Sequence, residues 1–208
     1  MTADEIQSAL VEITAETDTS LKHLRLASLV SAVFRARGVE LVVVGGSAIE
    51  FYTEGAYVSG DLDLCLISPA RLNVRTRQEL MGQLGARGGP RNWQVAGLFV
   101  DVLSEFENLA QTPIRRLSGP SGEIRLCPVE ELIVERILIS RYPGDYPPAR
   151  ECAKKLLAVA LLGGIETDWT EVRRLAESNA YKNWNDVKEL VHEQAQTLQI
   201  WSPYDSDE

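Results

Sequence analysis

The first fifty residues switch from a helical to a strand-like pattern of apolar positions. Over residues 4–38, apolar side chains recur near the 3.6-residue spacing of one helix face, which predicts a helix ending near Gly38. The next run, 41–44, is continuously apolar and β-branched, so it predicts a buried strand. Gly45-Gly46 ends that run, and a short helix is expected over residues 47–52.

The middle of the chain is dominated by strand patterns. Residues 61–67 begin by alternating acidic and apolar side chains, which predicts a strand with one polar face. A polar, arginine-bearing segment predicts a helix over 70–86, which Gly88-Gly89-Pro90 ends. Further strands are predicted at 93–95, 98–103 and 123–127, and Ala96-Gly97 is compatible with a hairpin turn.

Helical patterns dominate after Pro128. Helices are predicted at about 128–140, 148–162, 168–178 and 183–199. Residues 141–148 are rich in proline and glycine and form the best candidate linker. The predicted fold class is therefore α+β, with a mixed sheet and flanking helices in a domain over 1–140 and a C-terminal helical bundle over 141–208.

Composition and charge restrict the function classes. Hydrophobic residues make up 45% and charged residues 25% of the 208, as in ordinary globular proteins. The net charge of −9 argues against a broad nucleic-acid-binding face, although a bound cation could still attract a nucleotide. Three distant cysteines favour buried thiols in a reducing cytoplasm, and we expect neither a signal peptide nor a membrane span.

Two carboxylates at Asp61 and Asp63 carry the strongest chemical signal. Side chains at i and i+2 on a strand point to the same face, so these like charges repel and need a counter-charge. A divalent metal supplies it, because Mg²⁺ prefers carboxylate, water and phosphate oxygens. Asp101 on the later strand could complete a set able to hold two metals for an in-line nucleotidyl transfer, as a ligand or as the base.

The Gly45-Gly46-Ser47 turn is typical of a phosphate-binding loop. Glycines allow the backbone to approach a phosphate closely, and the amides of the following helix are donors. The Ser47 hydroxyl could donate to a phosphate oxygen. This turn and the three acids therefore predict a site for a metal-bound nucleoside triphosphate.

These motifs stand in an order that resembles a known superfamily. An apolar strand ends in Gly45-Gly46-Ser47, Asp61-Leu62-Asp63-Leu64 follows, and a later strand carries Val100-Asp101-Val102. This is similar to the signature of the polymerase-β-like nucleotidyltransferases. The resemblance implies a nucleotidyltransferase core fold and transfer of a nucleotidyl group from an NTP, such as ATP, to an acceptor hydroxyl with Mg²⁺ or Mn²⁺.

The helix predicted after Pro128 extends the resemblance. Residues 128–137 are similar to the helix that follows the third acid in small bacterial nucleotidyltransferases of the abortive-infection and toxin–antitoxin types, such as AbiEii and MenA. In those proteins a basic residue on this helix and an acid in the next turn face the nucleotide. Arg136, where a lysine is more usual, and Asp145 lie near the matching positions.

Several alternatives stay open at this stage. The acids could be an exposed strand face paired with arginines, and the cluster Arg71, Arg75, Arg77, Arg87 and Arg91 could be a solvated surface or a rim for a phosphate-bearing substrate. His23 and His192 are expected to face solvent. The acceptor could be tRNA, a protein or a small molecule such as an aminoglycoside, and the protein could instead be an inactive nucleotide-binding module on the same fold. The sequence leaves the oligomeric state open.

Overall fold

A computed structural model describes residues 1–67 and 72–205 of the chain. Contacts between residues divide the chain into two compact units. The first unit holds the sheet and consists of Met1–Phe51, Val58–Glu107 and Ile114–Cys127. The second unit is helical and consists of Tyr52–Tyr57, Asn108–Pro113 and the chain from Pro128 onward.

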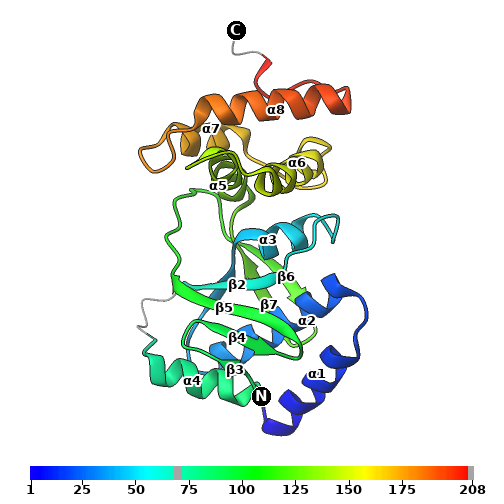
Figure 1. Cartoon of the computed structure of the whole chain (residues 1–208), viewed down its shortest axis with the longest axis vertical. Coiled ribbons are helices and arrows are strands. Elements are labelled where there is room, and N and C mark those ends of the chain that lie inside the picture. The colour runs from blue at the N-terminus through cyan, green and yellow to red at the C-terminus, as the bar shows by residue number, and fades with distance from the viewer. Residues whose placement is uncertain (68–71, 206–208) are drawn as a thin grey trace. The chain divides into compact units, whose positions relative to one another are not determined.

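The first unit is built on a seven-stranded mixed sheet with the order β3-β4-β5-β2-β1-β7-β6. Figure 1 shows the part of the sheet in which β2, β5, β4 and β3 follow one another. Two neighbouring pairs, β2 with β5 and β1 with β7, are parallel, and the other pairs are antiparallel. The strands are β1 (Leu41–Val43), β2 (Asp61–Leu66), β3 (Arg87–Gly88), β4 (Asn92–Val95), β5 (Leu98–Glu105), β6 (Arg115–Gly119) and β7 (Gly122–Leu126).

One face of the central strands is apolar and the other is polar. Leu62, Val100 and Trp93 lie side by side on β2, β5 and β4, and each is at most 5% exposed. Because side chains alternate along a strand, the residues between them point to the opposite face. That opposite face carries Asp61, Asp63 and Asp101, all of them half-buried. The acids thus lie on the polar face of a sheet whose opposite face packs in the hydrophobic core.

The helices of the first unit are α1 (Ala3–Ala15), α2 (Thr19–Arg35), α3 (Gly45–Tyr52) and α4 (Val74–Gln83). The single helix predicted over 4–38 is therefore wrong, because the chain breaks between α1 and α2. Asp18 takes the N-cap position of α2 and accepts a hydrogen bond from the Leu21 N–H at 2.9 Å. A short carboxylate that caps a helix start competes with helix continuation, and the apolar spacing alone hides this.

The helix predicted over 70–86 is shorter in the structure. Asn73 caps α4 by accepting from the Thr76 N–H, and the helix ends at Gln83. Residues 70 and 71 lie outside the described residues. Two strands, β3 and β6, were not predicted, because their residues are exposed or half-buried and give no apolar signal. Among the described residues, both lie at an edge of the sheet, with a strand neighbour on one side alone.

The second unit contains α5 (Val129–Arg141), α6 (Pro147–Leu161), α7 (Trp169–Glu177) and α8 (Trp184–Leu198). Helix α5 packs against the other three, and Leu132, Ile133 and Ile137 on it are at most 1% exposed. Because α5 buries its apolar side chains among helices, it belongs to the helical unit, which includes the chain from Pro128 onward. The domain division predicted at 140/141 stays a prediction.

The predicted α+β class is confirmed by the mixed sheet and by the helices that follow it. Cys65, Cys127 and Cys152 are all buried. Within the described residues, no helix combines the length and apolar character needed to cross a membrane.

Glu171 on α7 provides a test of the helical unit. Its carboxylate is 6% exposed and accepts from Arg174 Nε and Nη2 at 2.6 and 2.7 Å and from the Gln111 N–H at 2.6 Å. The Arg174 hydrogen bonds lower the pKa of Glu171 against an opposing effect of burial. We expect Glu171→Gln to reduce the free energy of unfolding at pH 7 by about 1 kcal/mol in urea titrations.

The pH dependence has a defined sign. A lowered folded-state pKa stabilises the fold above the ordinary glutamate value of 4.5, and this stabilisation is lost as the pH falls through the folded pKa. The difference between wild type and Glu171→Gln should therefore shrink below about pH 4.5. Glu177→Gln, at an exposed ion pair with Arg173, is the matched control and should change stability little. Equal stability of the two variants at pH 7 would contradict the assignment.

Candidate metal centre

Three carboxylates meet on the polar face of the sheet. Asp63 on β2 lies directly beside Asp101 on β5 in the parallel register, and Asp61 is two residues earlier on β2. One oxygen from each carboxylate lies within 4.8 Å of the other two. Within residues 1–67 and 72–205, these three form the only such group of metal-ligating side chains. The three acids predicted from the sequence to share a site therefore lie close together in the structure.

The alternative that arginines neutralise the acids finds no support at Asp61 and Asp101. Within the described part of the chain, neither Asp61 nor Asp101 has an ion pair with a lysine, arginine or histidine. The Asp61 carboxylate accepts instead from the Ser59 hydroxyl at 3.4 Å. Half-buried carboxylates that lie close together favour binding of a cation. The donor set, three carboxylate groups open to solvent on one side, fits Mg²⁺ or Mn²⁺.

The Gly-Gly-Ser turn is joined directly to the strand that carries the acids. Gly45 has φ +58°, a left-handed conformation that glycine adopts without strain, and α3 begins there. The Val44 N–H donates to the Asp63 carbonyl at 3.1 Å. The Ser47 hydroxyl donates to the Val44 carbonyl and accepts from the Asp63 N–H, both at 3.0 Å. The turn and the acidic strand therefore hold each other in position.

This geometry shows which groups of the turn are free to meet an anion. Ser47 is fully buried, and its single hydroxyl hydrogen is already donated to Val44. The first helical hydrogen bond runs from the Ala48 N–H to the Val44 carbonyl. The N–H groups of Gly45, Gly46 and Ser47 precede it and have no acceptor within the helix. The predicted phosphate contact of this turn thus rests on backbone amides.

Asn92 is a polar residue of the site that the sequence interpretation missed. It lies on β4 opposite Asp101, and its Nδ2 donates to both Asp101 carboxylate oxygens at 2.8 Å. A two-residue turn at Ala96-Gly97, with both φ values positive, closes the β4–β5 hairpin. Such a turn pairs residue 95 with 98 and hence 92 with 101, so the predicted hairpin already contained this signal.

A buried histidine supports the segment before Asp61. His23 Nδ1 lies 3.0 and 2.9 Å from the two carboxylate oxygens of Glu50, and both residues are at most 1% exposed. The Glu50 carboxylate also accepts from the Ser59 N–H at 2.9 Å. The prediction that His23 faces solvent is wrong, because α2 turns this position toward the buried Glu50 of α3. The contact orders the chain just before β2.

The arginines between the acids have different roles. Arg77 donates to the carbonyls of Val102 and Pro90 at 2.9 and 3.3 Å and so connects α4 to β5 and to the loop between β3 and β4. Arg75 pairs with Glu79 on the exposed side of α4. Arg87 and Arg91 are exposed, and Arg71 lies outside the described residues. The cluster is thus partly structural and partly a solvated surface.

Arg136 and Asp145 belong to the second unit. Arg136 lies on α5, and its Nε is buried without a hydrogen-bond partner among the described residues. Burial raises the pKa of the adjacent Glu135 carboxyl, and the charge of Arg136 opposes that rise. The Asp145 side chain is 84% exposed and lies 3.9 Å from Arg141 Nη1. The roles predicted for Arg136 and Asp145 toward a nucleotide stay predictions.

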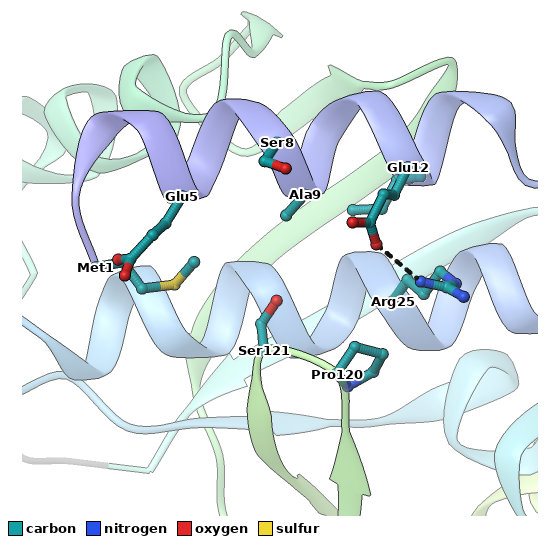
Figure 2. Close-up of a pocket in the computed structure, with 9 residues that line it drawn as sticks. Met1, Glu5, Ser8, Ala9, Glu12, Arg25, Pro120 and Ser121 are labelled. Atoms are coloured by element: carbon teal, nitrogen blue, oxygen red, sulfur yellow. Dashed lines mark hydrogen bonds and ion pairs between the residues drawn. The ribbon is translucent and has the colours of Figure 1, made fainter.

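A separate cavity of about 420 Å³ lies between α1 and the turn that joins β6 to β7 (Figure 2). An ion pair between Glu12 and Arg25 closes one end of it, with 3.3 Å between Oε2 and Nη1. The predicted site residues do not line this cavity. We therefore assign the candidate chemistry to the acidic face of the sheet.

Comparison with known proteins supports the fold. No protein-family model matches the chain, and no significantly similar sequence was found among curated proteins. Among solved structures, an antigenic nucleotidyltransferase-like protein from Paracoccidioides brasiliensis superposes with a TM-score of 0.59 at 11% identity, over 84% of this chain and 88% of that one. The antibiotic-resistance factor ANT(2'')-Ia superposes with a TM-score of 0.53 at 17% identity, over 82% of this chain and 95% of that one. The chain thus has a nucleotidyltransferase-like fold.

The acidic cluster predicts a metal affinity that can be measured directly. We expect Mn²⁺ to bind the wild-type protein in calorimetric or paramagnetic titrations. Asp61→Asn and Asp101→Asn should each weaken binding by about ten- to a hundredfold, because each removes a ligand charge. Glu107→Gln removes the same charge at an exposed position outside the cluster and serves as the control. Equal Mn²⁺ affinity in all four proteins would exclude a metal centre at these acids.

Proposed function

We propose that the protein is a divalent-metal-dependent nucleotidyltransferase that moves a nucleotidyl group from a nucleoside triphosphate to an acceptor hydroxyl. The observation that carries this proposal is the group of three carboxylates, Asp61, Asp63 and Asp101, whose oxygens lie within 4.8 Å of one another on a nucleotidyltransferase-like fold. The cation would neutralise the triphosphate and the leaving pyrophosphate.

The residues of the chain divide the work of such a transfer. Asp61 and Asp63 would hold the cation, and Asp101 would act as a further ligand or accept the proton of the acceptor hydroxyl. A bond forms between the acceptor oxygen and the α-phosphorus, and the bond from that phosphorus to the β-phosphate oxygen breaks. The N–H groups of Gly45, Gly46 and Ser47 bind phosphate oxygens at the positive end of α3.

The finer assignment, to the AbiEii and MenA type, rests on the resemblance of residues 128–137. The acceptor of the proposed transfer is tRNA, a protein or a small molecule, and one structural neighbour is an antibiotic-resistance factor. The rival proposal of a different class is a nucleotide-binding protein without catalysis on the same fold. Turnover measurements separate these proposals.

Substitution of Asp63 is the direct test. We expect labelled nucleotide to be transferred, and pyrophosphate released, by the wild type in the presence of Mg²⁺ with total tRNA, cell lysate or aminoglycosides as acceptors. Asp63→Asn and Asp63→Ala should reduce the rate by about a hundredfold or more, because they remove a ligand of the cation that would stabilise the charge on the reacting phosphates. Glu107→Gln should retain the wild-type rate. Background turnover in the wild type and in both variants, across all acceptors, would refute catalysis and favour the non-catalytic rival.

Asn92 tests the orientation of Asp101. Both carboxylate oxygens of Asp101 accept from the Asn92 amide, so Asn92→Ala should leave Asp101 less well oriented. We expect kcat to fall about tenfold with little change in KM for the nucleotide, as is typical when a residue that orients a metal ligand is removed. Gln83→Ala, at the exposed end of α4, is the control. A change in KM alone would assign Asn92 to nucleotide binding instead.

A further inference from the structure

A row of side chains on the polar face of the sheet extends away from the acids. The strand register places Asp61 on β2 beside Phe99 on β5, Phe99 beside Gln94 on β4, and Gln94 beside Arg87 on β3. Directly paired residues on neighbouring strands point to the same face. The row therefore shares the face of the three acids and runs parallel to the row of Asp63, Asp101 and Asn92.

The three outer residues of this row are open to solvent. Phe99 is 59% exposed, which is unusual for a phenylalanine in the middle of a sheet, and Gln94 and Arg87 are exposed as well. Within the described part of the chain, Arg87 has no acidic partner. An aromatic ring, an amide and an arginine without a partner, in this order, form a surface with distinct binding chemistry.

This row and the glycine turn lie on opposite sides of β2, which gives the nucleoside triphosphate and the acceptor separate positions. In the sheet, β1 lies on one side of β2, and β5, β4 and β3 lie on the other. The glycine turn proposed to bind phosphate follows β1, so the leaving pyrophosphate would lie on the β1 side of β2. Attacking and leaving oxygens lie roughly in line across the reacting phosphorus. The acceptor hydroxyl must therefore approach from the side of β5, β4 and β3.

We infer that the row Phe99–Gln94–Arg87 binds the acceptor and that the acceptor is the 3′ end of a single-stranded RNA. This inference rests on the proposed function. The row spans about 14 Å, three strand spacings from Asp61, which suits a terminal nucleotide and its linking phosphate. The ribose hydroxyl lies at the acids, a base stacks on Phe99, Gln94 contacts a base edge, and Arg87 binds a phosphate.

Binding of a 5′-fluorescein-labelled single-stranded RNA tests this surface without requiring turnover. In fluorescence anisotropy with Mg²⁺ and a non-hydrolysable nucleoside triphosphate, Phe99→Ala should weaken binding about tenfold. Phe99→Trp keeps a stacking ring and should bind within about twofold of the wild type. Because Phe99 is largely exposed, neither change should affect folding, which thermal unfolding verifies.

Substitution of Arg87 tests the proposed contact with an RNA phosphate. Arg87→Ala should weaken RNA binding and lower the slope of its salt dependence by about one. Arg37→Ala is the matched control, because Arg37 is an exposed arginine before the start of β1, at the end of that strand away from the glycine turn. Its removal should leave RNA binding unchanged.

The outcomes separate this inference from the function it rests on. RNA binding that is unaffected by Phe99→Ala and Arg87→Ala would overturn the inference. Transfer of nucleotide to an aminoglycoside or a protein but not to RNA would overturn it too and leave the proposed function standing. A loss of nucleoside triphosphate binding in Phe99→Ala would place the donor base on this row and likewise overturn the inference. Absence of transfer to any acceptor would refute the proposed function, whereas the RNA-binding measurement would stand by itself.

Discussion

Repulsion between three carboxylates is the constraint that the first unit has to withstand. Asp61, Asp63 and Asp101 bring negative charges within 4.8 Å of one another. Like charges this close raise the free energy of the folded state unless a cation neutralises them or solvent screens them. The strands must therefore be held in place by interactions that do not involve these side chains.

Backbone pairing, the buried face of the sheet and the glycine turn provide these interactions. The parallel ladder between β2 and β5 and the buried row of Leu62, Val100 and Trp93 fix the backbone under the acids. The Ser47 hydroxyl bridges the Val44 carbonyl and the Asp63 N–H, so the turn that offers phosphate donors and the strand that offers metal ligands form one rigid element. A site with this support is preorganised before any ligand arrives.

The residues just before β2 are held by a buried carboxyl group. Glu50 is fully buried and shares its carboxylate between His23 Nδ1 and the Ser59 N–H. A buried carboxylate is tolerated only when its hydrogen-bonding capacity is met, and removing a partner from such a group is costly. The pair therefore orders the residues before Asp61, because another path of this segment would take the Ser59 N–H away from the buried Glu50 carboxylate.

The parts of the structure that the sequence predicted are those with local signals. The β-branched run before Gly45, the alternation around Asp61 and the glycine break are properties of neighbouring residues, and they located β1, β2 and the acidic cluster. The contact of His23 with Glu50 joins residues 27 positions apart and has no local signal. The positions of Asn92 and Phe99 were partly predictable, because the two-residue turn at 96–97 defines which residues of β4 and β5 pair once the hairpin is recognised.

The length of that hairpin turn has a consequence for how the chain can vary. Since side chains alternate between faces, one residue inserted between Gly97 and Asp101 would turn the aspartate toward the core and a valine toward the acids. Two inserted residues would restore the facing of Asp101 but lengthen the loop. An even number of inserted residues in this hairpin should therefore keep the Asp101 side chain on the face of the acids, whereas an odd number should not. The edge strand β6 carries no residue of the acidic cluster, so the number of residues inserted there does not affect these acids.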